Sequence, residues 1–374
     1  MASIQSSRTA DENFIYEGSF QPLNNDPFWH GHLRRFTINS STGTVATEPD
    51  WDAGTVLKDN TTAASRVIKT YIGGASVDFT AATITKENLA VATDAERDIV
   101  VGYIRGDSAY NQDNWKLGDV FRSTPITVGE PSAYFEDFRD TSNPTAFSIH
   151  RSGHIRKTSP YSGRVILVGA NDGQLHAFRT SDGSEAWSFI PPNLLSRLKL
   201  IAHATEPSSL THQYFVDGPV TVADAWIPGS WSAGTTKSSG DWKTLLVFAE
   251  GRGAGTNLWS SSSSCDSGFN PAYTGTYPNY CGYWSLDVTS SLSPAFKWRV
   301  GIPAAQGPYM GAPWSKMMIG RVIDGGNEKW VGFIGGGAYA PGAANSGKSF
   351  HVVDLRDGSV LWSYSKANDA NLDS

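Results

Sequence analysis

The chain has 374 residues and a formal net charge of −6, and only 18% of its residues are charged. Mild acidity argues against a nucleic-acid partner, because such a partner requires a basic face. No apolar run approaches the ~20 residues that a membrane-spanning helix needs, so the sequence predicts no transmembrane segment. Aromatic residues make up 12% of the chain, with 38 Gly and 13 Trp, which is typical of a β-rich, turn-rich protein.

The first ten residues, MASIQSSRTA, are polar, and they predict a disordered tail over 1–10. They also lack the charged and apolar regions of a signal peptide. Two interpretations stay open at this point. Either the protein is cytoplasmic, or the sequence is a piece of a longer exported chain.

Residues 11–115 are predicted to form a lead-in segment that packs on the following sheets and contains one helix, near 93–105. Thr93 and Glu96 have the spacing of a capping box at its start. Gly106 is expected to end the helix, because glycine adopts the left-handed conformation easily. Arg105 then lies in the last turn, where a cation suits the helix dipole.

The tripeptide Arg105-Gly106-Asp107 at this helix end has two interpretations. It is a candidate receptor-binding motif of the kind that integrins bind, or it is a helix exit that happens to contain these three residues. A motif of three residues has a high false-positive rate. The receptor interpretation requires that Arg105 and Asp107 are both exposed.

From residue 116 to 374 the pattern changes to short strands with a recurring unit. The unit consists of a strand, a tight turn, a return strand and a tryptophan. Its copies are His176–Trp187, His351–Trp362, a looser Ser285–Trp298 and a fourth candidate, His32–Val45. Asp and Gly supply the turn conformations, and the tryptophan can close over a neighbouring unit. The expected fold is all-β: a modified β-propeller with long inserted loops and one N-terminal helix, with its closure within this chain left open.

Two cysteines, Cys265 and Cys281, lie in a long polar insertion over 251–282. A disulfide between them is expected to hold this loop, and closing about 15 residues would stabilise the fold by roughly 3 kcal/mol. Such a bond indicates an oxidising compartment. Two unpaired thiols remain the alternative. The GRGAG run at 251–255 is followed by Ser-rich sequence where a dinucleotide loop would open a helix, so we expect a hairpin turn there.

No catalytic motif is present, so the sequence predicts no catalytic, cofactor-binding or metal-binding residue. His30 and His32 could bind a metal weakly or form a surface pair. His150 and His154 are placed in a polar loop. The run Asp324–Glu328 lacks the ligand spacing of a calcium loop and is expected to form a turn.

Six stretches in a fixed order resemble the C-terminal propeller domain of the PilY/PilC-type family, the type IV pilus tip-associated biogenesis factors and adhesins. The resemblance covers nearly everything after residue 10. The stretches are 16–36 (YEGSFQPL…WHGHLRRF), 98–107 (DIVVGYIRGD), 117–129 (LGDVFRSTPITVG), 164–178 (RVILVGANDGQLHAF), 214–224 (YFVDGPVTVAD) and 347–364 (GKSFHVVDLRDGSVLWSY).

The resemblance implies quinoprotein-like propeller blades and an extracellular place at the pilus tip or cell surface. It implies contacts with minor pilins or a pilus tip complex, and with host or abiotic surfaces. Pilus assembly, surface adhesion and twitching motility are the implied roles. The family also implies calcium binding through an Asp-rich loop, but no residues of this chain match that loop. An Arg-Gly-Asp at this helix end resembles a common feature of the family.

Two other functions remain open from the sequence. The first is a quinoprotein-type dehydrogenase, whose blades carry a similar repeat; it would require an axial metal with acidic ligands and, in many cases, an adjacent cysteine pair. The second is a structural scaffold in a surface filament. An exposed aromatic patch rimmed by polar groups would favour a binding protein instead.

Overall fold

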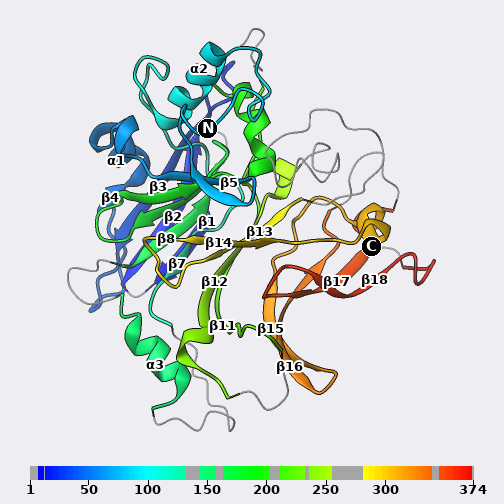
Figure 1. Ribbon diagram of the computed structural model, residues 1–374. Coiled ribbons are helices and arrows are strands. Elements are labelled where there is room, and N and C mark those ends of the chain that lie inside the picture. Colours follow the sequence, from blue (N-terminus) through cyan, green and yellow to red (C-terminus); the bar gives the residue numbers. More distant parts are fainter. Residues whose placement is uncertain are drawn as a thin grey trace.

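A computed structural model describes residues 7–11, 13–131, 144–156, 163–202, 211–231, 236–254, 281–338 and 345–372 (Figure 1). This part is mostly β, and its strands form four sheets, which confirms the all-β class. The prediction of a single helix was wrong, because the described residues contain three: α1 (Ala53–Asn60), α2 (Asp94–Arg105) and α3 (Ala146–Gly153). Helices α1 and α3 have only eight residues each, too few for a clear helical period.

The first sheet has the strand order β1-β2-β3-β4 and is antiparallel. Its strands are β1 (Ser7–Asp11), β2 (Phe14–Gln21), β3 (His30–Thr37) and β4 (Trp51–Asp52). Strand β1 pairs with β2 over its whole length, so the predicted disorder over 1–10 was wrong for residues 7–10. A polar segment can form an edge strand because hydrogen bonding to a neighbour supports it without burial. Residues 1–6 lie outside the described part.

The second sheet has six strands in the order β6-β5-β10-β9-β8-β7. They are β5 (Ile68–Ile72), β6 (Ala75–Asp78), β7 (Ile126–Val128), β8 (Val165–Gly169), β9 (Leu175–Arg179) and β10 (Glu185–Phe189). Strand β5 pairs in parallel with β10 and covers what would be an exposed edge. The predicted lead-in segment 11–115 therefore does more than pack on the sheets, since it supplies β2, β3 and β4 of the first sheet and two strands of the second.

The third and fourth sheets are antiparallel, with strand orders β11-β12-β13-β14 and β15-β16-β17-β18. Their strands are β11 (Val220–Trp226), β12 (Trp242–Ala249), β13 (Tyr283–Asp287), β14 (Ala295–Arg299), β15 (Met318–Asp324), β16 (Asn327–Gly335), β17 (Ser349–Asp354) and β18 (Val360–Ser365). Each sheet is a simple up-and-down arrangement in chain order.

A tryptophan on the last strand of each of the first three sheets fastens that sheet to the next one. The indole nitrogen of Trp187 donates to the carbonyl of Ser291 at 2.7 Å, and that of Trp298 donates to Leu355 at 2.7 Å. Trp51 donates in the same way to Thr180 at 3.2 Å. Neighbouring sheets therefore follow one another in chain order, as the colours of Figure 1 also show.

The repeated Asp-Gly turns lie at these sheet contacts. The carboxylates of Asp182 and Asp357 each accept a hydrogen bond from the backbone two residues further on, at 2.9 Å. The glycines that follow have φ of 73° and 77°. A Cβ on Gly183 would lie 2.7 Å from the Trp51 ring. Glycine is thus required both by the turn conformation and by the tryptophan of the preceding sheet.

The candidate repeat His32–Val45 was only partly right. Strand β3 and a turn are present, and Ile38 and Val45 form one isolated bridge. The paired return strand, however, is β4, where Trp51 lies opposite Arg35. The longer connection hid Trp51 from a search for a fixed spacing.

Helix α2 is the predicted helix. Its N-cap Thr93 and Glu96 form both hydrogen bonds of the capping box, and Gly106 ends it with φ of 81°. Val100, Tyr103 and Ile104 are buried.

Candidate functional site

The Arg105 guanidinium at the end of α2 is bound by the protein itself. It donates to the backbone carbonyls of Phe79, Ala63 and Arg66 at 2.6 to 2.9 Å. Asp107 is half-buried, and its carboxylate accepts from the backbone of Ala109. A shallow hollow of about 460 Å³ lies beside Gly106 and Asp107. This geometry favours a helix exit, because the arginine is not available to a receptor while it holds three carbonyls.

We expect Arg105→Ala to lower the free energy of unfolding by about 1–3 kcal/mol, since three carbonyls lose their donor. Asp107→Ala should change it by only about 0.5 kcal/mol, because it removes one bond of an exposed turn. Urea unfolding followed by tryptophan fluorescence measures both. Equal losses for the two variants would contradict this structural role for Arg105.

A cluster of aromatic rings and arginines joins all four sheets. We call it the aromatic–arginine cluster, and it consists of Trp29, Phe121, Arg122, His212, Tyr214, Arg252 and Trp314. Its members lie just before β3, β7, β11 and β15 and just after β12. The rings are half-buried and both arginines are exposed.

The members of this cluster contact one another directly. The His212 ring lies 4.0 Å from Trp29 and 4.5 Å from Tyr214, measured between ring centroids. The Arg122 guanidinium lies 5.1 Å from the centre of the Trp314 ring, and that of Arg252 lies 4.3 Å from the Tyr214 ring. Aromatic residues and arginine are the residue types most enriched at protein interfaces. The cluster is therefore a candidate protein-binding surface.

Two buried carboxylates form hydrogen bonds with members of the aromatic–arginine cluster. Asp119 is buried and binds His212 Nε2 at 2.7 Å and Asn171 Nδ2 at 2.7 Å. Asp217 accepts from the Arg122 backbone at 3.1 Å, and its other oxygen lies 3.6 Å from the Arg122 guanidinium. Burial and the nearby Asp119 raise the pKa of Asp217 to about 7, although Arg122 lowers it.

This shift predicts a pH-dependent stability. Because the pKa of Asp217 rises on folding from 3.8 to about 7, its contribution is complete below 3.8 and is lost as the pH rises through 7. Asp217→Asn stays neutral, so it should be more stable than the native chain at pH 8, by about 2–4 kcal/mol. Exposed Asp59→Asn is the control. A native chain that is more stable than Asp217→Asn at pH 8 would refute the prediction.

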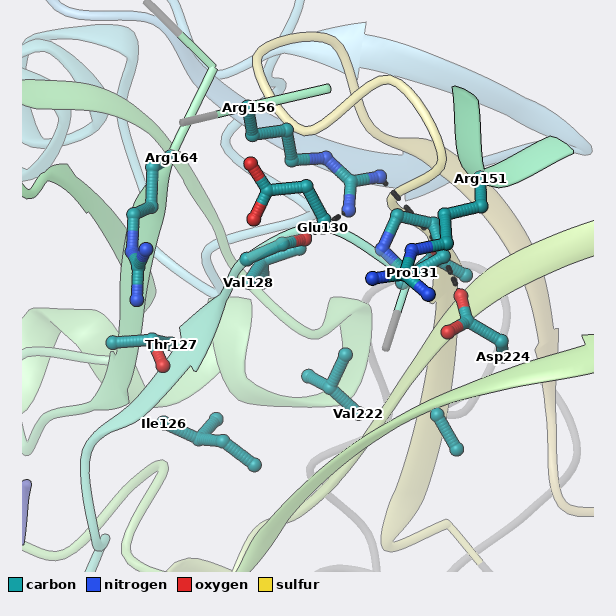
Figure 2. A pocket seen from close by; sticks show the side chains of 13 residues that line it. Ile126, Thr127, Val128, Glu130, Pro131, Arg151, Arg156, Arg164, Val222 and Asp224 are labelled. Carbon is teal, nitrogen blue, oxygen red and sulfur yellow. Dashed lines mark hydrogen bonds between the residues drawn. The ribbon is translucent and has the colours of Figure 1, made fainter. Parts of the chain in front are cut away.

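A cavity of about 470 Å³ lies between β7 and β11, beside α3, and contains several charged side chains (Figure 2). Arg156 donates to Gly129 O, to Thr289 O at 2.8 Å and to Val288 O at 3.4 Å. Arg156 thus ties the end of β7 in the second sheet to the third sheet. The cavity also holds Asp224, which accepts from Thr244 at 2.8 Å. The contacts of Arg156 in this cavity hold the second and third sheets together.

The two histidines of the His30–His32 pair bind different carboxylates. His30 binds Asp113 and His32 binds Asp52, each at 2.7 Å. The placement of His150 in a polar loop was wrong, because it lies in α3 and is buried. Within the described ranges, no group of three or more His, Cys, Asp or Glu side chains is arranged to hold a metal ion.

The remaining sequence predictions concern turns and the insertion. Gly325 and Gly326, both with positive φ, form the expected turn between β15 and β16. The strands that flank the GRGAG run, β12 and β13, pair as the expected hairpin, and Gly251–Ala254 forms a short 3₁₀ helix at the start of its enlarged connection. Residues 255–280 lie outside the described part, so the disulfide between Cys265 and buried Cys281 stays a prediction.

We expect the denatured, unreduced protein to contain no titratable thiol. After reduction it should contain two, and its thermal midpoint should fall, because the closed loop stabilises the fold by roughly 3 kcal/mol. Ellman titration before and after reduction measures this. Two thiols before reduction would rule out the bond.

Sequence reasoning missed the aromatic–arginine cluster, because no motif unites residues from four sheets. One signal was present. Asp119 precedes the edge strand β7 and Asp217 precedes the edge strand β11, in the stretches LGDVFRSTPITV and FVDGPVTVAD. An aspartate at equivalent places in two sheets predicts that both carboxylates gather at one end of the stack.

The fold and this site together define a class: an all-β protein of four sheets that contact one another in chain order, with a surface of aromatic rings and arginines. Comparison with known proteins identifies proteins of similar sequence. The chain is 26% identical over 380 residues to the type IV pilus biogenesis factor PilY1 of Pseudomonas aeruginosa strain PAK. It is equally identical over 341 residues to a PilY1 homolog of Xylella fastidiosa strain Temecula1. The resemblance predicted from the sequence is confirmed.

These matches cover most of this chain but a minor part of each relative. They span 96% of the chain and 28% of the Pseudomonas protein, and 88% of the chain and 22% of the Xylella protein. No protein-family model matches the chain. No helix among the described residues is long and apolar enough to cross a membrane.

Proposed function

We propose that this chain is a non-catalytic, protein-binding module of a type IV pilus biogenesis factor that acts outside the cell at the pilus tip. The observation that carries the proposal is the similarity to PilY1 proteins over 96% of the chain. Surface adhesion and twitching motility follow as roles, because both depend on assembled pili. Minor pilins are the proposed partners.

We propose further that the four sheets are blades of a modified propeller. Three four-stranded antiparallel sheets, and the four antiparallel strands β7–β10 within the six-stranded second sheet, dock side by side in chain order and support this arrangement. The segments just before β7, β11 and β15 would then meet near the axis, which is where the aromatic–arginine cluster gathers. A surface made from several blades binds a partner only when the blades are assembled.

The cluster has the chemistry of a protein-binding surface. Its rings are held rigid by mutual contacts and by the buried Asp119, so little side-chain entropy is lost when a partner binds. The exposed guanidiniums of Arg122 and Arg252 can bind carboxylates or backbone carbonyls of the partner. We therefore propose this surface as the pilin-binding site.

The test is capture of purified minor pilins from the same organism by the immobilised chain. Arg122→Glu and Arg252→Glu should each weaken capture at least about tenfold, which is about 1.4 kcal/mol. Arg356→Glu is the matched control, because Arg356 also lies over an aromatic ring, Trp231, outside the cluster. Equal capture by all variants would remove the cluster as the site.

Two further arms of the same experiment test the remaining expectations. A chelator tests the calcium that the resemblance implies, and Asp107→Ala tests the tripeptide. We propose that capture survives both changes. Turnover of alcohols with an added quinone cofactor and calcium would instead support the dehydrogenase alternative.

A further inference from the structure

Arg122 is the member of the aromatic–arginine cluster that lies beside a buried carboxylate. Its guanidinium is placed over the rings of Phe121 and Trp314, at 4.8 and 5.1 Å from their centres. The Arg122 side chain is 38% exposed, whereas that of Asp217, next to it, is 0% exposed. A partner and Asp217 therefore reach the same guanidinium from different sides, one from solvent and the other from the interior.

Asp217 is held in place, but only one of its carboxylate oxygens has a donor. Oδ1 accepts from the backbone N–H of Arg122 at 3.1 Å, and the Asp217 N–H donates to the Glu250 carbonyl at 3.1 Å. Oδ2 lies 3.6 Å from Arg122 Nη1, which is too long for a hydrogen bond. Among the residues that the structure describes, Oδ2 has no hydrogen-bond partner. A buried carboxylate oxygen without a donor favours the protonated form.

The neighbouring Asp119 carboxylate differs, because both of its oxygens are bound. His212 Nε2 binds one oxygen and Asn171 Nδ2 donates to the other, each at 2.7 Å. Burial raises the pKa of Asp119, but a proton on either oxygen would disturb one of these two bonds. Two buried carboxylates that lie close together do not both ionise easily. Of the two, Asp217 is therefore the group that gains and loses the proton.

The charged and titratable groups around Asp217 come from the segments before β7 and β11 and after β12. They are Asp119, Arg122, His212, which acts through Asp119, Glu250 and Arg252. Burial raises the pKa of Glu250 to about 7, so Glu250 titrates in the same range as Asp217. The Glu250 carboxylate, however, accepts from Trp284 and Asn193, which lie outside the aromatic–arginine cluster. Glu250 is therefore a matched control for a titration at Asp217.

We propose that Asp217 controls this surface: Arg122 binds a carboxylate of the partner while Asp217 is protonated, and it pairs with Asp217 once that group ionises. This inference rests on the proposed pilin-binding site. The exposed cations of Arg122 and Arg252 select an acidic segment as the occupant. An ionised Asp217 neutralises Arg122 and repels an incoming carboxylate. Binding of the acidic segment is therefore coupled to uptake of one proton, and the affinity falls as the pH rises.

Capture of purified minor pilins from the same organism at pH 6 and pH 8 tests the proposal. Because the pKa of Asp217 is about 7, the native chain should bind about tenfold more weakly at pH 8. Asp217→Asn stays neutral and keeps the acceptor for the Arg122 N–H, so at pH 8 it should bind about tenfold more tightly than the native chain. Glu250→Gln should keep the native fall. A fall that persists in Asp217→Asn, one that vanishes in Glu250→Gln, or capture that rises with pH would each overturn the proposal.

Modification of arginines by phenylglyoxal, resolved by peptide mass spectrometry, gives a readout that needs no pilin. At pH 8 ionised Asp217 holds Arg122, so Arg122 should react about threefold faster in Asp217→Asn than in the native chain. Arg356, which lies over Trp231 outside the cluster, should react equally in both. Faster reaction of Arg122 without pilin capture at either pH would reject minor pilins as partners and retain the control by Asp217. Equal reaction of Arg122 in both chains would overturn the proposal.

Discussion

Arg66→Met should lower the free energy of unfolding by about 3–5 kcal/mol, because it removes a cation bound to the buried Glu185 carboxylate and leaves that carboxylate to share His176 with Asp172. The Arg66 and Glu185 side chains are 0% and 2% exposed, and two parallel hydrogen bonds of 2.8 Å join them. Arg66 also donates to the Ile104 carbonyl at 2.7 Å, so it fastens α2 to the second sheet. Urea unfolding of the native and variant chains measures the loss.

The control is Arg97→Met, which removes an arginine from an exposed ion pair on the same helix and should leave the stability unchanged. The double variant Arg66→Met/Glu185→Met should recover much of the loss, since no buried charge remains unpaired. A loss below about 1 kcal/mol for Arg66→Met would contradict this account, because that is the size expected of an exposed pair.

Arg66 and Glu185 form a buried charged group with His176 and Asp172, and the stability that this group contributes depends on pH. Burial disfavours the charged form of His176, yet Asp172 and Glu185 raise its pKa from 6.5 to about 9. Its contribution is therefore complete below 6.5 and lost as the pH rises through 9. Burial likewise opposes ionised Glu185, but Arg66 and His176 lower its pKa from 4.5 to about 2, and this contribution is lost as the pH falls through 2. The buried charged group therefore stabilises the fold most between pH 4.5 and 6.5.

Trp187→Ala should cost about 3–5 kcal/mol of unfolding free energy, because it removes a buried indole between two sheets and leaves a cavity. Trp187 is 1% exposed and donates to Ser291 of the third sheet at 2.7 Å. Trp362→Ala removes the equivalent side chain of the fourth sheet, which is 51% exposed, and should cost only about 0.5 kcal/mol in this chain. Thermal and urea unfolding of the two variants compare them directly.

Both changes remove a tryptophan from an equivalent position, on the strand that comes last in its sheet in chain order. Equal losses would mean that the indole stabilises its own sheet, and that docking onto the following sheet contributes nothing. Trp187→Phe gives a further check. It should recover part of the packing but not the hydrogen bond to Ser291.

Short motifs in the sequence were sufficient to predict the helix and turns whose conformation is set by neighbouring residues. The capping box at Thr93 and the stop at Gly106 fixed helix α2, since both depend on a few adjacent residues. The Asp-Gly turns at 182–183 and 357–358 predicted hairpins correctly for the same reason.

Features that depend on distant pairing could not be predicted. Strand β5 joins β10 in parallel across more than a hundred residues, and Arg66 and Glu185 meet across 119 positions. The two repeat histidines show the same limit. His176 lies between two carboxylates, whereas burial between two serines lowers the pKa of His351 to about 4. The repeat predicts both positions but not their charges.

The aromatic–arginine cluster could not be predicted from the sequence for a related reason. Trp29 and Trp314 come from opposite ends of the chain, and only the order of the sheets brings their surroundings together. A sequence can indicate that rings and arginines are plentiful. It cannot indicate which of them share a surface until the strand pairing is known.

Surface piliation is the most direct measurement of the central claim, that this chain serves type IV pilus biogenesis. The gene is deleted from the organism that encodes it, and pilin sheared from the cell surface is quantified by immunoblotting. The account predicts that surface pilin is lost and that the native gene or Asp107→Ala restores it, whereas Arg122→Glu/Arg252→Glu does not. Normal surface pilin in the deletion strain would contradict the claim.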